Sequence, residues 1–155
     1  MAAEPQRAIA AQLNRQAEAM GWCPETPTTT TQVYRRKGTY VVLRLCQMAA
    51  YQGSYEVFAG DGTTFQRLTA TVLDENQTLM SATELSGLLT LDTQAGTLQV
   101  WHKARGAGDC GTFATYRLTG EGTAAQLVLQ TLRAKRECDG EFTPPNTYPQ
   151  RYPPG

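Results

Sequence analysis

The sequence predicts a mainly β fold, an antiparallel meander of about seven to eight strands that forms a sandwich or an open barrel, with one helix at the N-terminus. Three observations support this fold class. Apolar residues alternate with a period close to two from Val33 to Lys135, short turns interrupt the alternation, and one glycine-free segment with helical spacing precedes it. Strands joined by short turns pair antiparallel, because a parallel return needs a crossover of about a dozen residues or more.

The expected helix covers residues 4–20. Its first turn contains Pro5, which is tolerated there because the first backbone N–H groups of a helix have no partner within it. Apolar or small side chains recur at helical spacing, at Ile9, Leu13, Ala17 and Met20. Gly21 ends the helix, and the connector up to Thr31 is rich in proline and threonine, which favours extended backbone.

We expect the antiparallel β body over residues 32–138. Turns that contain glycine, aspartate or asparagine separate its alternating runs. The clearest strands cover Tyr40–Gln47, Tyr55–Ala59, Arg67–Leu73, Gly87–Leu91, Thr97–Lys103 and Thr112–Leu118.

The segment Ala124–Glu137 fits both helical and strand spacing. We expect a strand, because the turn Gly120–Gly122 follows the preceding strand directly. Such a strand would place four side chains on one face: Val128, Leu132, Ala134 and Cys138.

The C-terminal segment 143–155 contains five of the eight prolines, together with Tyr148 and Tyr152. This composition predicts an extended tail with polyproline character. We expect both tyrosines to pack against the rest of the chain, and a linear ligand for a proline-binding module is the alternative. One domain over residues 1–155 accommodates all these elements.

The charge balance excludes some classes of partner. Fourteen basic and fourteen acidic residues leave no net charge, so we do not expect a nucleic-acid partner. No apolar run approaches the roughly twenty residues that a membrane-spanning helix needs.

The cysteines Cys23, Cys46, Cys110 and Cys138 are even in number and widely spaced. No C-x-x-C pair is present, and the chain has only one histidine to add to a set of metal ligands. We therefore expect no metal and no cofactor. Two disulfides are the better interpretation, and of three connectivities Cys23–Cys46 with Cys110–Cys138 is the simplest. Four buried free thiols are the alternative.

The cysteines and the N-terminus point to different compartments. Ala2, Ala3 and Glu4 follow Met1, which is not a secretion signal and taken alone indicates the cytosol. Because disulfides persist in oxidising compartments, we expect an exported chain, periplasmic or secreted, whose leader has been removed ahead of Met1. Tethering to a membrane through that leader is an open alternative.

His102, the single histidine, is in phase with Leu98 and Val100 on one face of its predicted strand. This pattern is typical of a half-buried, hydrogen-bonded core residue. The alternative is a small hydrolase in which His102 is a general base oriented by Asp109. Its nucleophile would be one of three serines, none of them in a G-x-S-x-G turn: Ser54, Ser81 or Ser86.

The glycines Gly106, Gly108 and Gly111 lie between two predicted strands, so no helix N-terminus is available there to hold a phosphate. We expect a tight turn closed by a disulfide. Asp109 would accept hydrogen bonds from backbone amides, with Lys103 and Arg105 either solvated or paired with it.

Aromatic and basic residues near this turn form a candidate binding face: Tyr51, Trp101, Lys103 and Arg105. Filling of the core is the more common use of such aromatic side chains. A third hypothesis is an inhibitor of a cell-wall enzyme that inserts a loop, Arg35–Gly38 or Lys103–Gly108, into its target.

Several of these residues carry a resemblance. The run Arg105–Gly111, the segment Arg136–Gly140 around Cys138 and the tyrosine- and proline-rich end resemble the bacterial extracytoplasmic family called domain of unknown function 1176. Cys46 with Ala50–Gln52 is similar to that family's earlier cysteine and aromatic element. The resemblance implies a periplasmic or secreted protein and brings no established activity. We therefore expect a non-enzymatic binding or protein-interaction module of the cell envelope, with a protein or a small molecule as its ligand.

Overall fold

The computed structural model describes residues 4–23 and 31–154. Within these ranges the chain forms one α-helix, eleven strands and two short 3-10 helices, which confirms the predicted mainly β fold class with one N-terminal helix. Helix α1 covers Glu4–Met20. The strands are β1 (Thr31–Arg36), β2 (Thr39–Met48), β3 (Gly53–Gly60), β4 (Phe65–Arg67), β5 (Ala70–Leu73), β6 (Leu79–Ala82), β7 (Glu84–Asp92), β8 (Thr97–Lys103), β9 (Gly111–Thr119), β10 (Gln126–Lys135) and β11 (Gln150–Tyr152), with η1 (Gly122–Ala124) and η2 (Pro145–Thr147) as the 3-10 helices.

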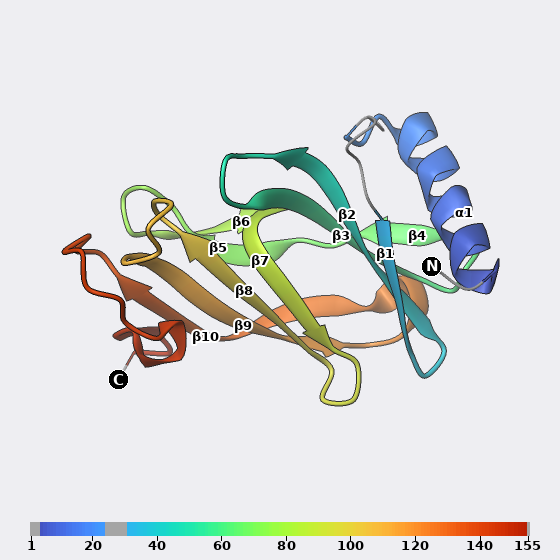
Figure 1. Ribbon diagram of the computed structural model, residues 1–155. Coiled ribbons are helices and arrows are strands. Elements are labelled where there is room, and N and C mark those ends of the chain that lie inside the picture. The colour runs from blue at the N-terminus through green and yellow to red at the C-terminus, as the bar shows by residue number, and fades with distance from the viewer. Residues whose placement is uncertain (1–3, 24–30, 155) are drawn as a thin grey trace.

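The main sheet is antiparallel throughout and stays open (Figure 1). Its strand order is β1-β2-β3-β7-β8-β9-β10-β11, with β4 paired to the end of β3. Strands β5 and β6 form a separate two-stranded hairpin. The fold is therefore a meander with one excursion between β3 and β7.

The sheet changes direction where β3 meets β7. These strands pair only over Gly53–Glu56 and Glu84–Gly87, after which β3 pairs with β4 and β7 pairs with β8. Gly87 has a φ of 141°, and a Cβ atom there would lie 2.5 Å from the backbone oxygen of Trp101. Glycine is required at this junction, both for its dihedral angle and for its close approach to β8.

The inner faces of both halves of the sheet share one hydrophobic core. Leu43 and Val57 come from the first half, and Leu98, Tyr116 and Leu132 come from the second. These side chains are nearly inaccessible to water, and burial of that kind is the main favourable contribution to folding.

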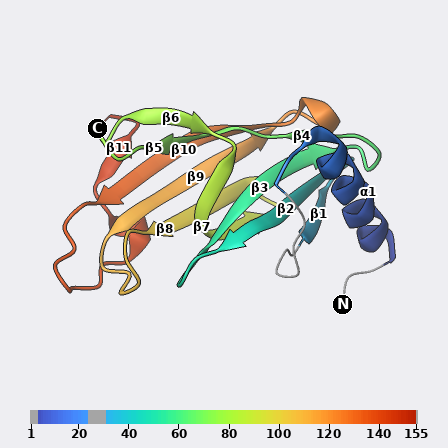
Figure 2. The ribbon, with the colours of Figure 1, turned by 90° about the horizontal axis from the view of Figure 1, so that it is seen from above.

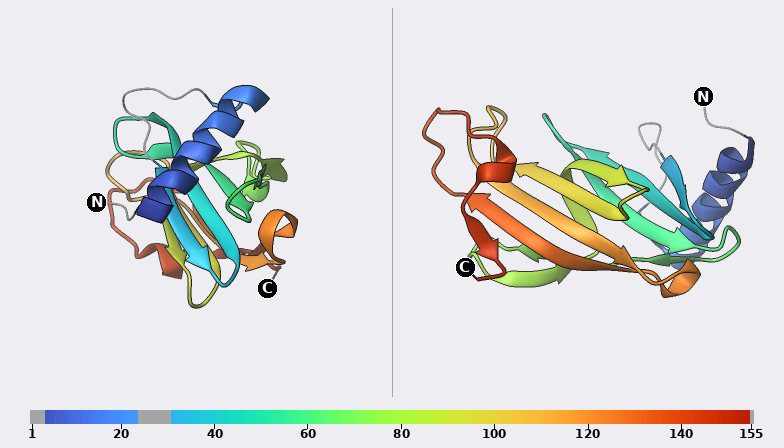
Figure 3. Two further views of the ribbon diagram at one scale, coloured as in Figure 1. Left: turned by 90° about the vertical axis from the view of Figure 1, so that its right-hand side faces the viewer. Right: turned by 90° about the horizontal axis from the view of Figure 1, so that it is seen from below.

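Helix α1 covers the outer face of the sheet at one end of the molecule (Figures 2 and 3). Ile9 and Leu13 pack on a second apolar cluster with Val42, Phe58 and Phe65. The side chain of Gln16 donates to the backbone oxygen of Phe65 and accepts from its N–H (2.8 and 3.0 Å), as a neighbouring strand would. Packing and hydrogen bonds together hold the helix against β4.

The β5–β6 hairpin lies against β9 and β10 without joining their ladder (Figure 2). The buried Tyr116 hydroxyl donates to the backbone oxygen of Thr71 at 2.6 Å. The tail also lies along the sheet, since β11 pairs with β10 and Tyr148 is fully buried.

Two strand predictions need correction. The run Arg67–Leu73 is two strands, because the chain leaves β3 after Arg67 and starts the hairpin at Ala70. In β10 a bulge between Leu129 and Thr131 shifts the phase, so Leu129 points into the core and Val128 is 46% exposed. A bulge adds one residue to a strand and so exchanges its faces, which alternation alone does not reveal.

Candidate functional site

A pocket opens at the end of the core away from α1. Its volume is about 200 Å³, and we call it the His102 pocket. Its floor is apolar: Val100, Ala114, Tyr116 and Leu132. Val72 and Leu73 of β5 and Leu85 of β7 contribute further apolar lining, and Glu84, Ser86, His102 and Thr112 supply the polar lining.

His102 also lines two adjoining grooves. One, of about 270 Å³, runs toward the β2–β3 turn and is lined by Met48, Gln52 and Ser54 among others. The other, of about 320 Å³, runs past Asp74 toward Arg136. His102 is the one residue common to the pocket and both of these grooves.

The backbone of His102 is fixed by glycine on both neighbouring strands. A Cβ atom on Gly111 of β9 would lie 2.0 Å from the backbone oxygen of His102, and one on Gly87 of β7 would lie 3.2 Å from its Cα. The three strands therefore approach closely at the mouth of the pocket.

The imidazole of His102 is anchored by the buried Gln52. The Gln52 amide accepts from the Lys103 N–H (2.9 Å) and donates to the Lys103 oxygen (3.1 Å), which fixes its orientation. Its second N–H then points to Nδ1 of His102 at 3.0 Å, so Nδ1 is the acceptor. The backbone oxygen of Ser86 lies 3.3 Å from the same nitrogen and is itself an acceptor, so it makes no hydrogen bond to Nδ1 when Nδ1 accepts from the closer Gln52. The N–H of the ring is then on Nε2.

Beside this contact, hydroxyl groups connect β3 and β7. Ser54 donates to Glu84, and Ser86 donates weakly to Ser54 at 3.5 Å. Ser81, the third serine of the hydrolase hypothesis, lies on β6 and does not line the His102 pocket.

Asp109 has different partners. Both of its oxygens contact the Arg105 guanidinium, with one N–H···O distance of 2.8 Å, and the Gly140 N–H donates to it at 2.6 Å. The Arg105 hydrogen bond, followed by that of Gly140, holds the pKa of the Asp109 carboxyl well below its usual range. None of the hydrogen bonds among the described residues joins Asp109 to His102, so the hydrolase hypothesis gains no support here.

The disulfide Cys110–Cys138 lies next to this ion pair. We call Cys110, Cys138, Arg105 and Asp109 the Cys110 cluster. Arg105 also donates to the backbone oxygen of Cys138 at 3.2 Å. Disulfide and ion pair together fix the glycine turn to the segment that follows β10.

The predicted binding residues gather around the same turn. The Tyr51 hydroxyl donates to the Ala104 oxygen at 3.3 Å, and a Cβ on Gly106 would lie 3.3 Å from the Tyr51 ring. The Lys103 ammonium lies 5.2 Å from the centre of the Trp101 ring. These side chains support the turn and do not line the His102 pocket. Arg36, from the loop of the inhibitor hypothesis, donates to the backbone oxygens of Thr93 and Gln94 (2.7 and 2.8 Å).

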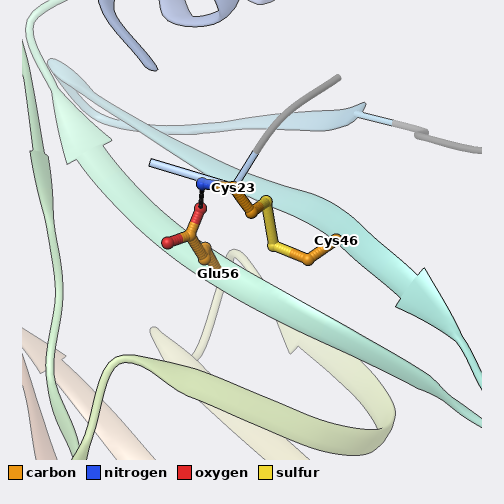
Figure 4. A group of neighbouring side chains, drawn as sticks. All are labelled: Cys23, Cys46 and Glu56. Carbon is orange, nitrogen blue, oxygen red and sulfur yellow. Dashed lines mark hydrogen bonds between the residues drawn. A yellow bond between two sulfur atoms is a disulfide. The ribbon is translucent and has the colours of Figure 1, made fainter. Parts of the chain in front are cut away.

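The second disulfide, Cys23–Cys46, lies beside Glu56 (Figure 4). Together with Arg44 these residues form what we call the Cys23 cluster. Arg44 is 1% exposed and donates to the Asn14 side chain at 3.0 Å and to the Cys23 oxygen. Glu56 accepts from Arg67 at 2.8 Å and from the Cys23 N–H at 3.4 Å. The pairing of both disulfides is the one that the sequence favoured.

Each cluster brings two sulfurs and a carboxylate within the mutual distance that metal ligands need. The sulfurs are bonded to each other in both, so neither offers the thiolate that binds a metal.

A family model described as "Protein of unknown function (DUF1176)" matches residues 2–153. The chain belongs to the DUF1176 family. This confirms the resemblance seen around Cys46, Cys110 and Cys138. No curated protein and no solved structure is significantly similar to this DUF1176 protein. Among the described residues, it contains no helix long and apolar enough to cross a membrane.

Sequence reasoning missed two parts of this DUF1176 protein. Gln52 falls in the run Ala50–Gln52 that resembles the family, but nothing there indicated its role, which appears only when the fold places it beside Lys103 and His102. Arg44 interrupts an apolar run. It lies on the same face of its strand as Val42, which packs under α1, and this shared face was the signal in the sequence that Arg44 is buried.

Proposed function

We propose that this DUF1176 protein is a non-enzymatic binding module that holds a small ligand in the His102 pocket. The observation that carries the proposal is an apolar floor beneath fixed polar groups, at the open end of a curved sheet. Ligand sites favour this combination, and the mouths of β-barrels are a common place for them. A cavity of about 150 Å³ admits benzene, so the pocket has room for a compact aromatic or aliphatic body.

The hydrogen bonds around the pocket support binding over catalysis. The acceptor nitrogen of His102 is occupied by Gln52, and the carboxylate of Asp109 is occupied by Arg105 and Gly140. A general base needs a free lone pair within reach of the proton that it removes. Neither the hydrolase hypothesis nor the inhibitor hypothesis has an observation in its favour, and the binding face at Tyr51, Trp101, Lys103 and Arg105 stays a prediction.

We also propose that the protein works outside the cytoplasm, in the periplasm or as a secreted protein. Two disulfides support this location, because cytosolic thiols are kept reduced. Detection of free thiols at all four cysteines, in protein trapped directly from its native cell, would contradict the proposal.

The binding proposal can be tested by isothermal titration with acetophenone, a compact aromatic ketone. Saturable binding at one site is expected for the wild-type chain. Ala114→Leu adds bulk to the pocket floor and should abolish binding, whereas Ala124→Leu makes the same change at an exposed position and should not. Ala114 is buried, so enlarging it also strains the core. Thr112→Leu, at the half-buried polar lining, therefore provides a second blocking variant. Binding that survives both blocking variants, or its absence from the wild type, would overturn the proposal.

A further inference from the structure

We propose that His102 selects the ligand of the pocket by donating a hydrogen bond from Nε2, and that this ligand is an uncharged molecule with a compact apolar body and one acceptor oxygen. The inference rests on the proposed function and adds to it the chemical class of the ligand. Gln52 is a positioning residue in this account, because it acts through the imidazole.

The first step is the direction of the donor. The two nitrogens of an imidazole point in different directions from the ring, and Nδ1 faces Gln52, which lines the groove toward the β2–β3 turn. Nε2 faces away from Gln52, and the other spaces that His102 lines are the His102 pocket and the groove toward Arg136. Among the described residues, no hydrogen bond engages Nε2, so its proton is available to a ligand.

The second step is the charge of the ligand. Among the residues that line the pocket, none is a lysine or an arginine, so an anion would lose its hydration without gaining a counter-ion. Glu84 is the one carboxylate in the lining. Its side chain is exposed and accepts from Ser54, which lines the neighbouring groove instead. Solvent screens a charge in that position, which leaves a buried cation poorly compensated.

The third step is the match between the donor and the floor. An acceptor oxygen at Nε2 would leave the rest of a small molecule against Val100, Ala114 and Tyr116. Burial raises the pKa of the Tyr116 hydroxyl, which keeps its proton and donates it to Thr71. Tyr116 is thus engaged elsewhere and contributes apolar surface to the pocket.

The test uses four planar phenyl compounds of similar size. Acetophenone carries an acceptor oxygen, α-methylstyrene replaces that oxygen with a methylene group, benzoate is an anion and benzamidinium is a cation. We expect the wild type to bind the two neutral probes and to bind both ions at least tenfold more weakly. Ions that bind as tightly as acetophenone would overturn the inference.

The role of His102 is measured by the ratio of the affinity for acetophenone to the affinity for α-methylstyrene. Comparing this ratio between variants cancels the difference in hydrophobicity between the two probes. His102→Phe keeps a planar ring without the donor and should reduce the preference for acetophenone by about threefold to tenfold, the usual range for one hydrogen bond. Thr90→Val removes an exposed hydroxyl outside the pocket lining and should leave the ratio unchanged. A ratio that His102→Phe leaves unchanged, or that Thr90→Val lowers as much, would overturn the assignment.

A ligand-free measurement tests Gln52. Long-range ¹⁵N NMR at neutral pH should show His102 as the Nε2–H tautomer in the wild type and as a mixture of tautomers in Gln52→Leu. The Nδ1–H tautomer in the wild type would contradict the inference. The absence of binding by all four probes would overturn the proposed function, whereas equal binding of all four would leave the pocket in place and remove only the role of His102.

Discussion

The Cys23 cluster and the Cys110 cluster use the same chemistry at two different depths. In each, a disulfide lies beside a carboxylate that an arginine contacts. The two carboxylates are buried to the same degree, 4% and 3% exposed, whereas the arginine side chain is 1% exposed in the first cluster and 50% exposed in the second. Removing one partner of a buried pair leaves a charge without compensation, while water compensates an exposed one. We therefore expect the burial of the arginine, more than the presence of an ion pair, to decide how strongly each cluster stabilises the fold.

The largest expected effect follows from this difference. Arg44→Ala leaves the Asn14 side chain and the Cys23 oxygen without a buried donor, and should lower the free energy of unfolding by about 3 to 5 kcal/mol. Arg105→Ala should cost less, because half of the Arg105 side chain is in water and the Gly140 N–H still donates to the buried Asp109 carboxylate. Urea unfolding of both variants measures the difference. Equal losses would show that burial does not separate the two clusters.

Removal of each disulfide sharpens the comparison. The two loops close over similar separations of 23 and 28 residues, so chain entropy predicts a similar loss of about 3 kcal/mol for each. The double change Cys23→Ala with Cys46→Ala should exceed that value, because it removes the sulfur that Arg44 contacts at 2.9 Å and the bond that holds the Cys23 backbone oxygen against Arg44. The change Cys110→Ala with Cys138→Ala should remain near it. A larger loss from the Cys110 pair would reverse the ranking.

The pH dependence of stability separates the clusters in another way. The pKa of Asp109 is lowered by the fold, so its stabilising contribution is fully present above the unfolded carboxyl pKa of about 4 and is lost as the pH falls below it. The stability difference between the wild type and Asp109→Asn should therefore shrink during acidification from pH 5. Glu121→Gln, at an exposed turn, is the control. A difference that stays constant down to pH 2 would contradict the account.

The smallest expected effect concerns two buried tyrosines. The Tyr116 hydroxyl holds the β5–β6 hairpin through Thr71, whereas the Tyr148 hydroxyl, although buried, has no hydrogen-bond partner among the described residues. Tyr116→Phe should cost about 1 kcal/mol and speed hydrogen exchange in residues 70–82, since it leaves a carbonyl unpaired. Tyr148→Phe should cost less than about half of that. Identical exchange of the hairpin in both variants would argue against this tie.

Local sequence patterns predicted the features that depend on local chemistry. Helical spacing predicted α1, and short turns predicted antiparallel pairing. The spacing of the four cysteines favoured the pairing that the structure shows. In each case the relevant signal lies within a few residues or in a simple count.

The remaining features depend on distant residues, so local patterns could not reveal them. Arg67–Leu73 reads as one strand, and only its pairing divides it, because β4 pairs with the end of β3 whereas β5 pairs with β6. The bulge between Leu129 and Thr131 follows from the register against β9. The groove beside the pocket joins Gln52, Ser86 and His102, which lie in three different segments of the chain. No pattern in any one segment predicts that meeting.

Chemical-shift mapping of the wild-type chain with acetophenone tests the central claim most directly. The account predicts saturable shifts of backbone amides around Val100, Ala114 and Leu132, together with the side chain of His102. Shifts confined to the glycine turn around Tyr51 and Trp101, or no saturable shift at all, would contradict it.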